Sequence, residues 1–250
     1  MGLDFSRITA MSIPQGSATK IEVSGVKLWQ AVTYPEKSDI ITMNLDGTDR
    51  QYRVLKKVQG STFEVLGLFS PNTSITFRDN ETNTYSGSNV DTYLNTTWYN
   101  TLSSTAKTAI VDKTITQYEY TDTRSEYNAD THASYAGYST KTSKGSMVRH
   151  IYALDCEDVE MYFGGTGGSA SATTKGTFSK ADVLTAFYNQ STPSYTYALR
   201  SSRYVSRAGV QRYDIGWIIN TNGDIDSTNV DNNRAVFPAF QIDLSKVTYE

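Results

Sequence analysis

The sequence contains one cysteine, two histidines and five prolines among its 250 residues. One cysteine excludes a disulfide framework and any zinc site built from several cysteines. The apolar runs are only a few residues long, which excludes a transmembrane helix. The first residues lack a basic stretch followed by an apolar one, so we expect no secretory signal peptide.

Charge is also scarce and nearly balanced. Lysine and arginine number 23 against 26 aspartates and glutamates, which gives a net charge of -3. A general nucleic-acid-binding protein would carry a basic face. We therefore expect no nucleic-acid partner and no membrane insertion.

Hydroxyl-bearing residues are abundant. Sixty residues are Ser or Thr and 18 are Tyr, whereas charged residues make up only 20% of the chain. Tyr supplies a large contact area at low entropic cost, and Ser supplies adaptable hydrogen bonds, so this composition suits a binding surface. Thr and Tyr are also strand formers, and composition alone does not separate a binding surface from an ordinary β-rich protein.

The N-terminal segment, residues 1–37, differs from the rest of the chain. Between residues 13 and 29, apolar residues alternate with polar ones and are interrupted by glycine, which predicts two short strands with a turn near Ser24-Gly25. A hairpin this small is not stable alone. We expect it to pack on the main domain, on a neighbouring subunit or on a partner.

The main body is predicted to span residues 38–250 and to begin with strands. Asp46-Gly47 is a hairpin signal between strands at 39–43 and 51–58. A third strand is expected at 62–70. The polar residues 71–87 are predicted to form a loop.

Two short helices are expected after this loop. Ser88 or Asn89 is a candidate N-cap for the first, and Ser103 or Ser104 for the second, over residues 103–110. The helical spacing predicts an apolar inward face on each helix: Val90, Tyr93, Leu94 and Trp98 in the first, and Ala106, Ala109 and Ile110 in the second.

The second half alternates between loops and regular elements. Residues 117–147 show little periodicity and are predicted to be a long insertion or loop set. A strand is expected at 151–154, and then a helix capped by Asp155 that ends at 163. The remaining sequence predicts a Gly-rich loop at 164–176, a helix beginning at Ser179, strands at 196–200, 215–220 and 236–243, and a turn at Asn222-Gly223. This order predicts an α+β fold.

Four segments carry a resemblance in a fixed order: residues 88–110, 151–163, 197–201 and 205–244. Together they resemble a family of lectin-like domains that is common in gut bacteria and their phages. The sequence departs from the family pattern at Tyr197, where Trp is usual, and at Val236-Phe237. The resemblance implies a C-type lectin fold, related to formylglycine-generating enzymes and to the variable proteins of diversity-generating retroelements.

The N-terminal run from residue 13 to 31 resembles a segment found in tail-associated proteins of phages that infect gut Gram-positive bacteria. The two resemblances together imply a phage or prophage tail-tip adhesin. Such a protein is made in the bacterial cytoplasm and located on the virion, where it contacts other tail components. By analogy with tail-fibre tips, a homotrimer is the expected assembly.

The C-terminal stretch is the predicted ligand-binding site. Arg and Tyr are frequent binding anchors, and this stretch interleaves them with polar residues between short apolar segments. An ordinary solvated loop is the alternative interpretation. The candidate residues are Arg203, Tyr204, Ser206, Arg207, Arg212, Tyr213, Asp214, Asn222, Asp224, Asp226, Asn229, Asp231, Asn232 and Asn233. In retroelement-diversified relatives the variable segment lies at this place.

Catalytic, metal and cofactor sites are not expected. His132 and His150 are interpreted as surface residues and Cys156 as a buried core residue. The formylglycine-generating branch works through a pair of cysteines, and one cysteine excludes that activity. The segment from Asn220 to Asp226 has alternating oxygen side chains but lacks the bidentate Glu of a calcium loop, so a turn is the preferred interpretation.

The sequence therefore predicts a non-catalytic protein that binds a bacterial surface protein or glycan. A structural tail or baseplate component is the first alternative. A cell-wall glycan hydrolase is the second, because such enzymes need two carboxylates. The acidic residues that this alternative would use are Asp155, Glu157, Asp158 and Glu160, for which a solvated acidic helix face is the commoner meaning.

Overall fold

The computed structural model describes residues 20–23, 26–30, 33–77, 83–122, 140–163, 197–207, 210–219 and 225–250. The chain divides into two compact units, residues 1–34 and residues 35–250. In the first unit, β1 (Lys20–Val23) and β2 (Val26–Gln30) pair antiparallel. The expected N-terminal hairpin is confirmed.

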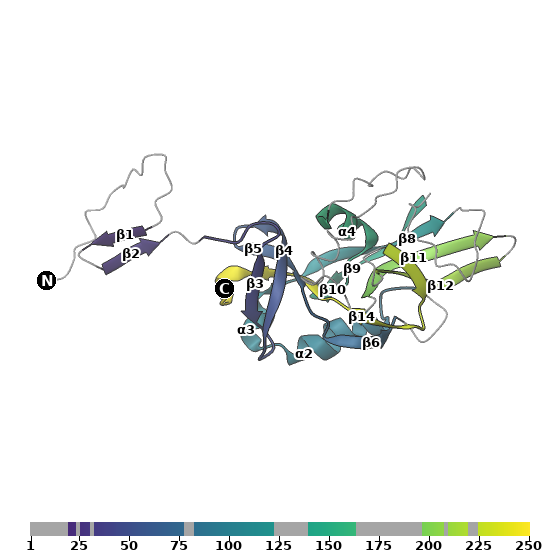
Figure 1. The fold of residues 1–250 in the computed structure, drawn as a ribbon, viewed down its shortest axis with the longest axis horizontal. Helices are drawn as coiled ribbons and strands as arrows, with labels where there is room; N and C mark the ends of the chain where they lie inside the picture. Colours follow the sequence, from purple (N-terminus) through teal and green to yellow (C-terminus); the bar gives the residue numbers. More distant parts are fainter. Residues whose placement is uncertain are drawn as a thin grey trace. The chain divides into compact units, whose positions relative to one another are not determined.

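The described residues of the second unit form two sheets (Figure 1). The first sheet has the strand order β10-β15-β5-β4-β3, and β7 also pairs with β15. Its strands are β3 (Ile40–Asn44), β4 (Asp49–Gln59), β5 (Thr62–Gly67), β7 (Ile110–Val111), β10 (Ile151–Tyr152) and β15 (Ala239–Asp243). The β3–β4 hairpin encloses Asp46-Gly47, as the sequence predicted, and Gly47 has the positive φ of 90° that such a turn requires.

The second sheet has the order β13-β12-β11-β14-β6, and β8 joins it by pairing with both β11 and β9. Its strands are β6 (Asn72–Thr76), β8 (Lys113–Asp122), β9 (Thr140–Arg149), β11 (Tyr197–Arg207), β12 (Val210–Ile219), β13 (Ile225–Asn229) and β14 (Asn233–Val236). The chain passes from this sheet to the first one between β14 and β15, at Phe237-Pro238.

Two loop predictions are wrong. The 71–87 region contains β6, whose residues Asn72 and Ile75 pair with β14. The predicted insertion at 117–147 begins and ends as the paired strands β8 and β9. In β8 the buried positions are Ile115, Gln117 and Glu119. The strand was missed because two of these inward residues are polar, which removes the apolar alternation that identifies a strand.

The first helical segment has the predicted buried face and also contains a π-helix, which the sequence did not predict. It comprises α1 (Asn89–Thr92), the π-helix η2 (Tyr93–Trp98) and α2 (Tyr99–Thr101). Ser88 caps it, because its hydroxyl accepts a hydrogen bond from Asp91 N at 3.1 Å. Val90, Leu94 and Trp98 are buried, and Tyr93 is half-buried.

The remaining described helices are also capped. In α3 (Ser104–Ala109), Ser103 accepts a hydrogen bond from Ala106 N, and Ala106, Ala109 and the following Ile110 are buried as expected. In α4 (Cys156–Phe163), Asp155 Oδ1 accepts from Asp158 N at 2.8 Å. The 3₁₀ helix η3 (Leu244–Lys246) follows β15.

An aromatic cluster joins the first sheet to the π-helix. Tyr52 packs edge-on against Phe69 and Phe240, with ring centroids 5.5 and 5.7 Å apart, and Trp98 contacts both phenylalanines. Gly67 is required beside this cluster, since an added Cβ would lie 2.8 Å from the Phe69 ring and 2.9 Å from Pro238.

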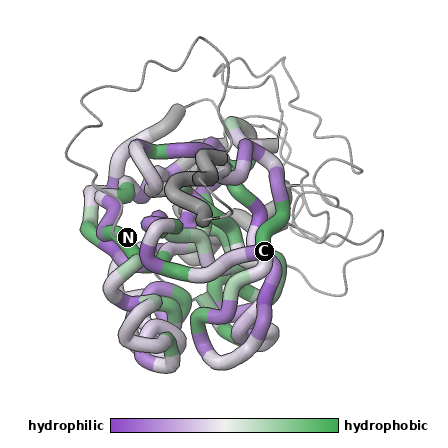
Figure 2. Tube along the Cα trace, turned by 90° about the vertical axis from the view of Figure 1, so that its left-hand side faces the viewer, coloured by the Kyte–Doolittle hydropathy of each residue, from purple (hydrophilic) through white to green (hydrophobic). Residues whose placement is uncertain are grey.

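Hydrophobic and hydrophilic stretches alternate along the chain trace (Figure 2). Within the described part of the chain, no helix has the length and apolar character needed to cross a membrane.

Candidate functional site

The predicted ligand-binding residues lie largely on three neighbouring strands. β11 pairs with β12 and β12 pairs with β13, all antiparallel. We name these three strands the candidate sheet. The predicted residues on its strands are Arg203, Tyr204, Ser206 and Arg207 on β11, Arg212, Tyr213 and Asp214 on β12, and Asp226 and Asn229 on β13.

Strand register places two of these residues, Arg203 and Asn229, in one row across the three strands, on either side of β12. Arg203 lies opposite Ile215, and Ile215 lies opposite Asn229. On the other side, Arg203 pairs with Tyr120 of β8. The register of β11 against β12 shifts between Arg203 and Val205, so Tyr204 lies at an irregularity. Such bulges often re-aim side chains.

The other five predicted residues are not among the described residues of these three strands. Asp231, Asn232 and Asn233 are exposed in the turn before β14 and at its first residue. Asn222 and Asp224 lie outside the described residues, as does most of the Asn220–Asp226 segment considered for calcium.

The expected loop from Arg203 to Asp214 is wrong. It was predicted to lie between strands at 196–200 and 215–220. In the structure both strands continue into this stretch, so the predicted residues within the stretch form part of the β11–β12 hairpin. Arg, Tyr and Ser are frequent in this stretch, and the regular apolar alternation that would have identified the strands is absent.

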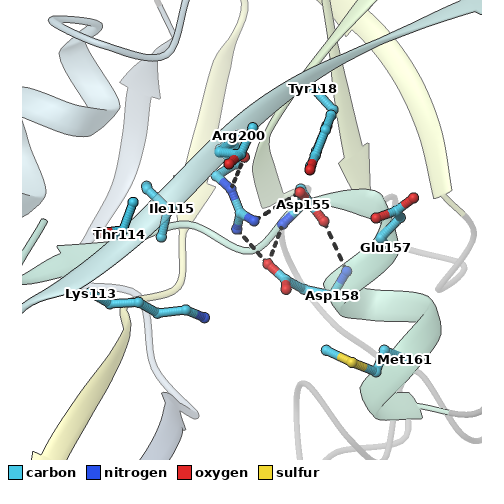
Figure 3. Close-up of a pocket in the computed structure, with 10 residues that line it drawn as sticks. Lys113, Thr114, Ile115, Tyr118, Asp155, Glu157, Asp158, Met161 and Arg200 are labelled. Carbon is cyan, nitrogen blue, oxygen red and sulfur yellow. Dashed lines mark hydrogen bonds and ion pairs between the residues drawn. The ribbon is translucent and has the colours of Figure 1, made fainter. Parts of the chain in front are cut away.

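A cavity of about 450 Å³ lies between β8 and α4 (Figure 3). Arg200 of β11 forms part of its wall, so the cavity adjoins the second sheet. The lining residues are Lys113, Thr114, Ile115, Thr116, Tyr118, Asp155, Glu157, Asp158, Met161 and Arg200.

Arg200 is hydrogen-bonded to several of the segments that form the wall of this cavity. Its side chain is 5% exposed, and its guanidinium binds two carboxylates at once: Nη2 donates to Asp155 Oδ2 at 2.8 Å, and Nη1 donates to Asp158 Oδ2 in a short contact. Nη1 also donates to Ala153 O at 2.8 Å, and Nε donates to Thr116 O at 3.3 Å. We name Arg200, Asp155 and Asp158 the arginine cluster.

The two carboxylates of the arginine cluster titrate differently. Burial raises the pKa of Asp155 to about 6, against the opposing positive charge of Arg200. Burial acts in the same direction on Asp158, but the positive charges of Arg200 and Lys113 hold its pKa below the ordinary value. One guanidinium faces two buried carboxylates, so the proton is more easily held by Asp155.

A third buried carboxylate, outside the arginine cluster, binds the cavity residue Lys113. Glu64 of β5 is fully buried, and its Oε1 accepts from Lys113 Nζ at 2.7 Å and from Tyr152 Oη at 2.6 Å. Lys56 Nζ lies 3.5 Å from Oε2. Burial would raise the pKa of Glu64, but Lys113 lowers it below the ordinary value.

The expected solvated acidic face on α4 is therefore wrong for Asp155 and Asp158, which are 2% and 8% exposed. Sequence inspection missed their partner because Arg200 lies more than forty residues further along the chain. Both carboxylates bind Arg200, and Asp155 also caps α4, so the pair has a structural role. Glu157 is partly exposed at the rim of the cavity.

A second cavity, of about 510 Å³, borders the π-helix and the end of β9. At its floor, Arg149 binds Asp91 through two hydrogen bonds of 2.6 Å. At its rim, His150 stacks on Tyr99, with ring centroids 4.4 Å apart, and its Nδ1 forms a short contact with Asp112. His150 is partly exposed, as expected, whereas His132 lies outside the described residues. Cys156 is buried, as expected.

Comparisons with known proteins identify the family of this chain. The family described as "Domain of unknown function (DUF6273)" matches residues 68–244. No curated protein and no solved structure matches the chain. The matched span covers every element from β6 to β15, and so includes both cavities and the candidate sheet. Because the match extends over most of the chain, the protein belongs to the DUF6273 family.

Proposed function

We propose that this protein is a non-catalytic receptor-binding protein with a C-type-lectin-like domain, carried at a phage or prophage tail tip. It binds a bacterial surface protein or glycan through the candidate sheet and the exposed turn that follows it. Residues 1–34 attach it to other tail components. The resemblance of the four ordered segments and of the N-terminal run motivates this assignment.

One observation carries the proposal. Most of the predicted contact residues, which are spread over more than twenty positions, fall on three strands that are hydrogen-bonded neighbours. A sheet holds contact residues at fixed spacing, and strands beneath a contact surface supply stability independently of the residues that touch the ligand. Arg and Tyr, which supply most binding energy at protein interfaces, are the main large residues among them.

One further feature favours binding over catalysis. Asp155 and Asp158, two of the four acidic residues that a glycan hydrolase could use, are bound by Arg200. Several copies on one virion would convert weak individual contacts into strong attachment.

The test is a cell-binding measurement with a double variant. Labelled protein is incubated with a panel of intact gut Gram-positive bacteria, and attachment is measured by flow cytometry. Tyr204→Ala combined with Tyr213→Ala removes two aromatic anchors from the paired strands of the β11–β12 hairpin. We expect the loss of most attachment with an unchanged melting temperature.

A matched control is available on the other sheet. Gln51 and Gln59 are exposed on β4, and replacing both by Ala should leave attachment unchanged. Equal attachment by the tyrosine variant and the wild type would refute the placement of the site. Failure of the wild-type protein to attach to any member of the panel would contradict the function itself.

Diversification of this site is the finer part of the proposal. It is tested by sequencing the 3′ end of the gene across a natural population. Substitutions concentrated between residues 203 and 233, beside a near-copy repeat and a reverse transcriptase gene, are the expected result. An invariant segment without such a repeat would leave an adhesin of fixed specificity.

A further inference from the structure

We propose that the cavity between β8 and α4 is a binding site for a neutral ligand with adjacent hydroxyl groups, which is the chemistry of a saccharide. The site is separate from the residues assigned to receptor binding on the candidate sheet. Its volume of about 450 Å³ falls within the range of small-molecule sites, which combine a concave surface with a few convergent polar groups.

Two polar atoms remain open to the cavity from opposite walls. Lys113 Nζ donates to Glu64 Oε1 at 2.7 Å and to Tyr152 Oη at 3.2 Å, and an ammonium group has a third proton to donate. The hydrogen bonds that Asp158 accepts from Arg200 and from the backbone of Asp155 all use Oδ2, so Oδ1 retains its accepting capacity. The side chains of Lys113 and Asp158 point toward each other across the cavity (Figure 3).

Both groups already have charged partners within the protein. Lys113 is paired with the buried Glu64, and Asp158 shares the buried Arg200 with Asp155. These carboxylates and Glu157 at the rim oppose an anionic ligand. Any charged ligand would also lose hydration in a partly desolvated site, which is costly. A hydroxyl group can both donate and accept, and two adjacent hydroxyls satisfy the Asp158 acceptor and the Lys113 donor together without adding charge.

The rim supplies apolar surface on two sides. Met161 is 55% exposed on α4, although a large apolar side chain on a helix surface is normally better covered. Tyr118 of β8 lies on the other side of the opening and presents an aromatic ring (Figure 3). A sugar ring offers C–H groups that pack on such surfaces while its hydroxyls face the polar floor.

The test is an NMR titration of the full chain with free saccharides. Glucose, galactose, mannose and N-acetylglucosamine are the neutral probes, and ethylammonium and acetate are the charged controls. We expect at least one saccharide to shift the backbone amide signals of residues 113–118 and 155–161 at millimolar concentration. Charged probes should produce smaller shifts at the same concentration.

Two matched variants locate the site. Met161→Arg places a long cation at the opening of the cavity and should weaken saccharide binding by about tenfold or more. Val148→Arg makes the same change at a residue of β9 that is also 55% exposed but lines the other cavity, and it should leave binding unchanged. Both positions are exposed, so both variants should fold, and their amide spectra verify this.

Three results would overturn the proposal: no saccharide shifts the cavity signals, the charged probes bind as tightly as the saccharides, or Met161→Arg binds like the wild type. Should Met161→Arg fail to fold, Tyr118→Ala is used instead, and unchanged binding by that variant would have the same meaning. Cell attachment, which is assigned to Tyr204 and Tyr213, is measured separately from saccharide binding. The proposals for the cavity and for the candidate sheet can therefore be refuted independently.

Discussion

Arg200 connects four segments of the chain through one side chain. It contacts Thr116 on β8, Ala153 after β10, and the two carboxylates at the start of α4, while its own backbone belongs to β11. A buried ion pair adds little net stability compared with apolar residues, but removing one partner leaves an uncompensated buried charge. The arginine cluster therefore fixes where α4 sits against β8 and β11.

Replacing each carboxylate of the arginine cluster by a neutral amide should change the free energy of unfolding by a different amount. At pH 7 the raised pKa of Asp155 makes its ionised form unfavourable in the folded state, whereas the lowered pKa of Asp158 makes its ionised form favourable. Asp155→Asn should change the free energy of unfolding by less than about 1 kcal/mol, since Asn also caps helices. Asp158→Asn should cost about 3 kcal/mol. Urea unfolding at pH 7 measures both.

The two pKa shifts fix the sign of the pH dependence of folding stability. The folded-state pKa of Asp155 lies near 6, above its ordinary value of 3.8, so the stability that it contributes is fully present below pH 4 and is lost as pH rises toward 6. Asp158 acts in the opposite sense and loses its contribution as pH falls. Asp155→Asn should remove the decline between pH 4 and 6. A decline of unchanged size in this variant would show that another group is responsible.

At the scale of elements, the helix faces were predictable because apolar spacing is local. The π-helix was not predictable from the local apolar spacing, and one of its side chains pairs with another element. Asn95 donates to Ile151 O at 2.8 Å and accepts from Ile151 N at 3.1 Å, so the side chain pairs with the backbone of β10 as a neighbouring strand would. π-helical turns of this kind are often found next to functional sites. Here the turn borders the cavity at Arg149.

Strand prediction failed where polar residues face inward. Gln117 is 1% exposed because it donates to Asn83 O and accepts from Tyr85 N, both at 2.7 Å. A Gln side chain can be buried at little cost when both its N–H and its carbonyl oxygen are hydrogen-bonded. In the sequence, however, such a Gln looks like a loop residue. The binding residues on the candidate sheet were predicted from their residue types, whereas the cavity at α4 was missed because it is built by contacts between distant segments.

The N-cap of α3 gives a paired test at this scale. The sequence offered Ser103 or Ser104 as the cap, and the structure selects Ser103, whose hydroxyl accepts from Ala106 N at 3.1 Å. Ser103→Ala should lower the free energy of unfolding by about 1 kcal/mol. Ser104→Ala should have no such effect, because Ala is favoured within a helix. Thermal melts compare the two variants, and equal losses would argue against this cap.

At the scale of the whole molecule, the aromatic cluster and both sheets belong to residues 35–250, and the N-terminal hairpin is a separate compact unit. Deletion of residues 1–34 should therefore leave the melting temperature of the remainder within a few degrees of the full chain. Under the proposed function the truncated protein still attaches to cells but is no longer incorporated into virions. A truncated protein that fails to fold would show that the hairpin completes the second unit.

The position of β15 has a consequence for how the chain reaches this structure. Strand β15 is hydrogen-bonded to β5, β7 and β10, so it lies inside the first sheet although it comes from residues 239–243. During synthesis, β5 leaves the ribosome more than 170 residues before the strand that covers its edge. That edge stays open to other chains throughout this interval, and closure over so long a separation is slow. The nascent protein should therefore depend on chaperones until its last strands are made.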